Sequence, residues 1–373
     1  MNIIRLCSSI FFFTLFTFNL QAEQTSSDFI TIADNKIIHD NIVLKLVQDS
    51  RGYIWIGTPG GALRYDGYNF RRYQSKADDK FTLSGNFIRD ILILQNGDIA
   101  FLSDPEGLSI LHIETEKITR FNMLPALKKF QKNKSFRTLA QTPNGDLWLG
   151  GVDGVIKVSA NLDQAEIFKK TVEKKSMGHI RSFLVDNEQL YIGSDTGLYK
   201  FNNLLRGIEQ VPLPNGKEPP LINRLLKTDD GTIWAGGNTH IYYSRSIDVG
   251  FNIIQNITSE TKSDPRVNAM LQVDKSHIWL ARFGKIQVID IKNHKFLSDL
   301  KPNKDNDFKL ASNDIRSLLK DDSGQIWLGG FGGGLQRYLG QVAVSTLRSQ
   351  KQNSTFNLTH PSISAIQLSL IHI

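Results

Sequence analysis

Short apolar runs separated by polar, glycine-rich turns recur along the chain, and each recurrence has the same internal order. The clearest copy is GYIWIGTPGGALRYDG, from Gly52 to Gly67. When the copies are aligned, one mainly aromatic position stands in each, 43 to 48 residues after the previous one. These positions are Trp55, Ala100, Trp148, Tyr191, Trp234, Trp279 and Trp327, which include all five tryptophans of the chain. The pattern therefore indicates seven repeats of one supersecondary unit.

Each repeat is typical of four short β-strands. A strand such as IVLKLV comes first, then a polar turn, the aromatic strand, a Gly/Asp break, and a third and fourth strand such as NFRRYQ or VAVSTL. The strands are apolar on both faces, as in sheets that are covered on both sides. A period near 45 residues is that of a propeller blade. We therefore predict an all-β fold, a seven-bladed β-propeller of four-stranded antiparallel blades.

The aromatic position is predicted to be structural, at Trp55, Trp148, Tyr191, Trp234, Trp279 and Trp327. An indole buries a large area, and its N–H is expected to bond the adjacent sheet. The second repeat has Ala100 and Leu102 where the others mostly have Trp and Gly, so we expect that blade to pack differently. The Gly60-Gly61 pair is no phosphate loop, because the segment that follows it is β-like rather than helical.

The repeats resemble the two-component regulator propeller repeats of bacterial sensor proteins. The carrying residues are Asp49, Gly52, Trp55, Gly57, Thr58, Gly61, Leu63, Tyr65, Asp66 and Gly67, and in the last copy Asp321, Gly324, Trp327, Gly329, Gly334, Leu335 and Tyr338. The resemblance covers residues 41 to 338. It implies an extracytoplasmic sensor that precedes a β-sandwich domain, a membrane helix and an output module: a histidine kinase, a hybrid kinase or a diguanylate cyclase. We expect these parts beyond the present segment.

The N-terminal residues predict export. Arg5, the apolar run IFFFTLFTFNL and a cleavage site after Ala22 indicate a signal peptide over residues 1–22, with an uncleaved anchor as the alternative. We expect a periplasmic location, with the full-length protein anchored in the inner membrane. Cys7 is the only cysteine, so the mature chain has no disulfide.

The segments on either side of the repeats complete the expected domain organisation. Residues 23–40 form an N-terminal lead-in strand, which pairs either with the last blade or with an absent second array, and the propeller spans residues 41–347. Residues 348–367 resemble the start of a truncated eighth repeat, and residues 368–373, LSLIHI, a sequencing-adapter artefact. A genuine short terminus is the alternative to this truncation.

Charge and composition narrow the class of ligand. The formal net charge of +7 and the pI of about 9.2 invite a nucleic-acid partner. The basic residues are scattered, however, and an exported chain does not meet nucleic acid, so we predict none. A mildly basic surface favours an anionic ligand or the membrane surface. The eight histidines lack His-x-His or His-x-x-x-His spacing, and we predict neither a metal site nor a cofactor.

One column of the alignment suggests a binding site. Eleven residues before the aromatic position, or ten in the fourth repeat, stand Leu44, Arg89, Arg137, Arg181, Asn223, Asn268 and Arg316. The first strand of a propeller blade lines the central channel, so these side chains would form a polar ring at one channel mouth. Arginine binds carboxylate or sulfate, and asparagine bridges hydroxyl groups. A structural role is the alternative that we favour, because recurrence at equivalent positions is typical of bonds between blades.

Three functions are consistent with these features. The first is a sensing module that binds an extracellular small molecule or oligosaccharide and signals to downstream domains of the same chain. If the arginine column binds the ligand, we expect the ligand to be acidic. We also expect the full-length protein to form a dimer. The second is an exported propeller enzyme, a lyase or glycosidase, although no asymmetric catalytic cluster stands out. The third is a protein-binding scaffold. We predict the sensor, without catalytic activity in this portion.

Overall fold

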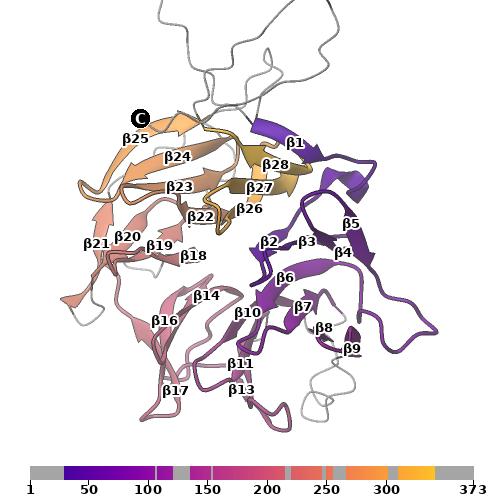
Figure 1. Cartoon of the computed structure of the whole chain (residues 1–373). Helices are drawn as coiled ribbons and strands as arrows, with labels where there is room; N and C mark the ends of the chain where they lie inside the picture. Colours follow the sequence, from indigo (N-terminus) through magenta and orange to yellow (C-terminus); the bar gives the residue numbers. More distant parts are fainter. Residues whose placement is uncertain are drawn as a thin grey trace, which may run out of the picture. The chain divides into compact units, whose positions relative to one another are not determined.

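The computed structural model describes residues 29–105, 107–120, 135–152, 154–214, 220–245, 249–254, 266–300 and 310–340. Within them the chain forms seven antiparallel sheets of four strands each. The sheets follow one another around a centre, with the first strand of each innermost (Figure 1). The predicted seven-bladed propeller is therefore confirmed. The expectations for residues 1–22, 348–367 and 368–373 lie outside the described residues.

Blades one to three are regular. Blade one contains β2 (Lys45–Gln48), β3 (Ile54–Thr58), β4 (Gly61–Tyr65) and β5 (Phe70–Tyr73). Blade two contains β6 (Ile88–Ile93), β7 (Ile99–Ser103), β8 (Gly107–His112) and β9 (Lys117–Arg120). Blade three contains β10 (Phe136–Gln141), β11 (Leu147–Gly151), β12 (Gly154–Val158) and β13 (Ala165–Phe168).

Blades four to six repeat the same order. Blade four contains β14 (Ile180–Asp186), β15 (Gln189–Ser194), β16 (Gly197–Asn202) and β17 (Gly207–Val211). Blade five contains β18 (Ile222–Lys227), β19 (Ile233–Gly237), β20 (Ile241–Ser244) and β21 (Asn252–Ile254). Blade six contains β22 (Ala269–Gln272), β23 (His277–Arg282), β24 (Lys285–Asp290) and β25 (Lys295–Leu300).

The two ends of the described chain meet in blade seven. This sheet contains β26 (Asp314–Lys320), β27 (Ile326–Phe331) and β28 (Leu335–Tyr338), and its fourth strand is β1 (Phe29–Ala33). The Phe29 and Tyr338 rings lie 5.2 Å apart. Of the two partners considered for the lead-in strand, the last blade is the one it pairs with. The segment VAVSTL, considered as a fourth strand, lies outside the described residues. A short 3-10 turn (η1, His39–Asn41) leads from β1 toward blade one.

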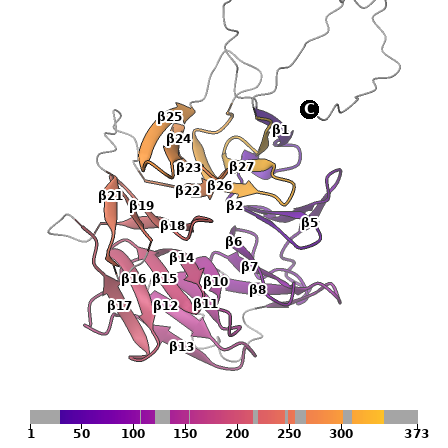
Figure 2. The ribbon, with the colours of Figure 1, turned by 60° about the vertical axis from the view of Figure 1, so that its left-hand side comes forward.

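The hydrophobic core is divided among the blade interfaces. Seven clusters of buried apolar residues lie between successive sheets, the last one between blades seven and one. The side view shows adjacent sheets stacked face to face (Figure 2). Second strands such as β3 and β11 therefore bury both faces, which explains why their sequences are apolar without alternation, whereas outer strands such as β5 and β25 keep exposed positions.

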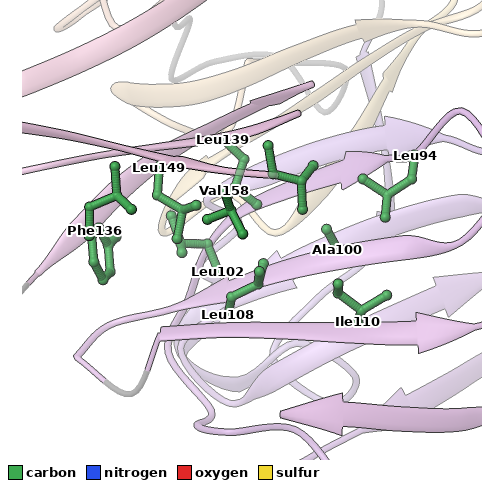
Figure 3. Packing of buried hydrophobic residues seen from close by; sticks show 11 residues of the cluster. Leu94, Ala100, Leu102, Leu108, Ile110, Phe136, Leu139, Leu149 and Val158 are labelled. Carbon is green, nitrogen blue, oxygen red and sulfur yellow. The ribbon is translucent and has the colours of Figure 1, made fainter. Parts of the chain in front are cut away.

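Blade two packs with different residues, as its sequence departures predicted. Figure 3 shows its Ala100 and Leu102 facing blade three, where Phe136 stands at the position that is Val or Ile in the other blades. Leu94, Leu108 and further leucines complete this cluster. Larger aliphatic and aromatic side chains around Ala100 thus occupy the volume that an indole fills elsewhere.

The aromatic side chains face the following blade, but the predicted partner of their N–H groups was wrong. The indole Nε1 of Trp55 donates to Asp49 at 3.0 Å and that of Trp327 to Asp321 at 2.7 Å. Trp148 and Trp234 donate in the same way to Thr142 at 3.2 Å and Thr228 at 3.1 Å. Each acceptor lies six residues earlier, in the turn of the same blade. A polar side chain that already caps the turn is nearer than any group of the adjacent sheet.

The glycine two residues after the aromatic position allows close contact between blades. A methyl group on Gly57 would lie 3.1 Å from Cγ2 of Ile88, and one on Gly329 would lie 2.6 Å from Cβ of Val43. Gly236 approaches Val267 in the same manner. In each case the neighbour is the apolar residue that opens the next blade. At Gly57, Gly236 and Gly329 an added side chain would therefore push the blades apart, whereas blades two and six have Leu102 and Ala281 at this position.

We predict that Gly329→Ala lowers the free energy of unfolding by about 1–3 kcal/mol, because the added methyl overpacks the interface with Val43. Urea unfolding measures the loss. Gly60→Ala is the matched control, since its methyl would meet no atom nearer than 3.5 Å. Adding Val43→Ala to Gly329→Ala should recover part of the loss. Equal stability of Gly329→Ala and Gly60→Ala would contradict the packing role.

We predict that Asp49 makes stability depend on acid pH. Burial raises the pKa of its carboxyl, but hydrogen bonds from Trp55, Arg51 and Tyr53 outweigh this and hold the pKa below the usual value of 3.8. The carboxylate thus stabilises the fold above pH 3.8, and this contribution disappears as the pH falls through the lowered pKa. Asp49→Asn should cost about 1–3 kcal/mol at pH 7 and much less near pH 2. The exposed Asp78→Asn is the control; a penalty independent of pH would refute the role.

Candidate functional site

The first strands of all seven blades converge on a cavity of about 290 Å³. Its basic lining residues are Lys45, Arg89, Arg137, Arg181, Arg224 and Arg316. Blades one to five and blade seven each contribute one of these cations, and blade six contributes Ala269 and Met270. The centre of the propeller is therefore strongly cationic on its wall.

The column predicted from the sequence divides into two groups. Arg89, Arg137, Arg181 and Arg316 line the cavity. Asn223 and Asn268 are buried between blades instead. The amide of Asn223 donates to the carbonyl oxygen of Val267 at 2.5 Å, and that of Asn268 donates to the Asp314 carboxylate at 2.9 Å. Both asparagines thus link their blade to the next one, the structural role considered for the column.

Lys45 and Arg224 were not among the predicted site residues. A register shift between Ile222 and Arg224 marks a β-bulge, which blades two, three, four and seven have at the same place. In blade five Asn223 bonds the neighbouring blade and Arg224 lines the cavity. Lys45 likewise stands one position after the column. That following column reads Lys45, Asp90, Thr138, Ser182, Arg224, Ala269 and Ser317. Its polar character is the signal by which the two residues could have been found.

Three of the arginines are neutralised by carboxylates. Nε of Arg89 donates to Asp104 at 2.9 Å, and the terminal nitrogen lies 2.8 Å from the same carboxylate. Arg181 pairs with Asp195 at 2.5 Å, and Arg316 pairs with Asp314 at 2.5 Å. These close contacts fix the three guanidinium groups at the edge of the cavity.

Lys45 is also paired, through a carboxylate that joins three blades. Its ammonium group lies 2.7 Å from Asp90 of blade two. The other oxygen of Asp90 accepts the backbone N–H of Leu139 in blade three at 2.8 Å. Asp90 is buried, so removing either partner would leave a desolvated charge. The Lys45–Asp90 pair therefore serves mainly to hold neighbouring blades together.

Arg137 and Arg224 have no carboxylate partner in the described part of the chain. Nε of Arg137 is buried without a hydrogen bond. Burial, followed by the adjacent Arg181 and Arg89, lowers the pKa of Arg137. Arg224 donates to the carbonyl oxygens of Asn223 at 2.8 Å and Arg181 at 3.4 Å, and burial lowers its pKa to about 10. Both remain protonated at neutral pH.

The site thus has an unbalanced charge. Six cations on the wall face four carboxylates, those of Asp90, Asp104, Asp195 and Asp314, which leaves an excess of two positive charges. Like charges held close together in a partly desolvated cavity raise the free energy of the empty site. A small anion would lower it. Among the described residues no cluster of three or more His, Cys, Asp or Glu side chains could hold a metal ion.

A family model described as two component regulator propeller matches residues 37–60 and 309–332. These stretches contain Trp55 and Trp327 with their turns. A search of curated proteins found no match. Within the described residues no helix has the length and hydrophobicity needed to cross a membrane.

Solved structures show the same fold. The extracellular domain of BT3049 from B. thetaiotaomicron, assigned to a hybrid two-component system, is 18% identical to this chain with a TM-score of 0.68. That of BT4673 from the same organism, assigned to a one-component system, is also 18% identical to this chain, with a TM-score of 0.67. The chain is covered to 84% and spans 42% and 40% of those two domains. Virginiamycin B lyase from Staphylococcus aureus is 12% identical, with a TM-score of 0.62 over 83% of this chain and 98% of the lyase.

Similarity at this level of identity establishes the propeller fold, whereas the matched repeats establish the kind of propeller. The two matched segments lie in the first and last blades, which stand side by side in the ring. The first and last of the seven repeats therefore match the two-component regulator propeller repeat.

Proposed function

We propose that this propeller is the extracytoplasmic ligand-sensing module of a bacterial signal-transduction protein, and that its ligand is a small anion bound in the central cavity. The observation that carries the proposal is the excess of cations on the cavity wall, with Arg137 and Arg224 lacking a carboxylate partner within the described residues. The kind of repeat, and the extracellular origin of the similar two-component domains, support the location and the role in signalling.

The size of the cavity limits the ligand. A volume of about 290 Å³ lies at the lower end of the range of small-molecule sites. It suits a monosaccharide acid or a compound of similar size. An acidic oligosaccharide would place only its terminal unit inside. A mainly hydrophobic ligand would leave the guanidinium groups desolvated and unpaired, at a cost in free energy.

Signal transmission follows from the rigidity of the ring. Seven interlocked interfaces resist deformation of single blades, so we infer that ligand binding is transmitted by rigid-body movement against neighbouring domains. The chain spans about 40% of the similar extracellular domains. The rest of such a protein would supply the further domains, the inner-membrane anchor, the contacts of a dimer and the output module.

We predict that acidic ligands raise the melting temperature of the exported chain and neutral ones do not. Glucuronate and sulfate are compared with glucose by thermal unfolding and calorimetry. At a concentration one hundred times the Kd the bound state gains about 2.7 kcal/mol. Added salt should weaken the binding, since it screens the cavity charges. A shift with glucose equal to that with glucuronate, or no shift with either acid, would argue against the proposal and in favour of an enzyme or a scaffold.

A further inference from the structure

One column at the channel mouth supplies the carboxylate that neutralises the arginine in blades two and four. Four residues after the aromatic position stand Pro59, Asp104, Val152, Asp195, Asn238, Phe283 and Phe331. In blades two and four this residue is an aspartate, and it pairs with the arginine of the same blade, Arg89 or Arg181. Blade three also has an arginine, Arg137, but the column residue is Val152. The carboxylate that completes the pair in the two neighbouring blades is missing there.

The backbone around Val152 has the same arrangement as in the neighbouring blades. The N–H of Asp104 donates to the carbonyl oxygen of Phe87 at 3.0 Å, and the N–H of Asp195 donates to that of His179 at 3.0 Å. The N–H of Val152 donates to that of Ser135 at 3.2 Å. Each acceptor lies two residues before the arginine of its blade. The three residues therefore share the same backbone hydrogen bond, and in blade three the position holds a valine instead of an aspartate.

Arg137 lies between two charged arginines and is not itself neutralised by an ion pair with any described residue. It stands in the blade between Arg89 and Arg181, both of which are held by their own aspartates. It makes no ion pair in the described part of the chain, its Nε is buried without a partner, and it lines the cavity. A guanidinium in such a position provides planar donors to one carboxylate group.

We infer that a carboxylate of the ligand binds Arg137 in the place that Asp104 and Asp195 occupy in the neighbouring blades. This deepens the proposed function and rests on it, because it assigns the subsite and the class of ligand within the same cavity. The ligand is a small carboxylic acid whose acid group lies at blade three and whose remaining atoms extend into the cavity. A carboxylate is favoured over a tetrahedral anion because it reproduces the planar group that two equivalent arginines already hold.

The test supplies the missing carboxylate from the protein. Val152→Asp should pair with Arg137 and weaken glucuronate binding at least about tenfold, since a charge-assisted bond to the ligand is lost. Val152→Asn, which adds a polar group without charge, should bind glucuronate within about twofold of the unmodified chain. Arg137→Ala should lose binding like Val152→Asp, and the exposed Arg71→Ala should not. Calorimetry measures each Kd.

The melting temperature of the ligand-free variants tests the proposed subsite independently of the choice of ligand. In the ligand-free protein Val152→Asp should raise the melting temperature at low salt, because it neutralises Arg137, and Val152→Asn should not. A melting temperature of the ligand-free protein that Val152→Asp and Val152→Asn change equally would overturn the assignment. Glucuronate binding that survives Val152→Asp and Arg137→Ala overturns it while leaving the proposed function intact. Failure of the unmodified chain to bind any acid overturns both.

Discussion

The packing of each blade onto the next is the constraint on which the rest of the structure depends. No single core exists among the described residues; seven interfaces each bury a tryptophan or its substitute and the apolar residue that opens the following blade. The glycine two residues after the aromatic position brings the backbones close enough for this contact. One kind of blade interface repeats around the ring with local variation, and the ring closes when β1 completes blade seven.

The same packing determines which side chains line the central cavity. The apolar residue that opens each first strand is held against the preceding blade, so the residues that follow it must point toward the next blade or the central cavity. In blade five Asn223 takes the first direction and Arg224 takes the second. The scaffold is thus symmetric, while the side chains that it displays differ from blade to blade.

Much of this arrangement could be predicted from the sequence, for identifiable reasons. The aromatic column and its spacing required only local patterns, and they predicted seven blades of four strands. The closing partner of β1 could not be predicted, since strand pairing between residues about 300 positions apart leaves no local signal. The predicted acceptor for the Trp55 indole N–H was wrong because Asp49 was considered only as a turn residue. Lys45 and Arg224 were missed because the predicted site was confined to one column of the alignment, and both residues stand one position after it.

The repeat also gives a criterion for separating structure from function. Where Arg89 and Arg181 meet an aspartate of their own blade, recurrence has a structural explanation, because the pair is satisfied within the fold. Asn223 and Asn268 are explained in the same way by their bonds to the next blade. Arg137 has the arginine of the pattern without the aspartate, and burial, followed by the nearby Arg181 and Arg89, lowers its pKa. A position that keeps one half of a recurring pair at a cost in stability is where selection for binding is most readily inferred.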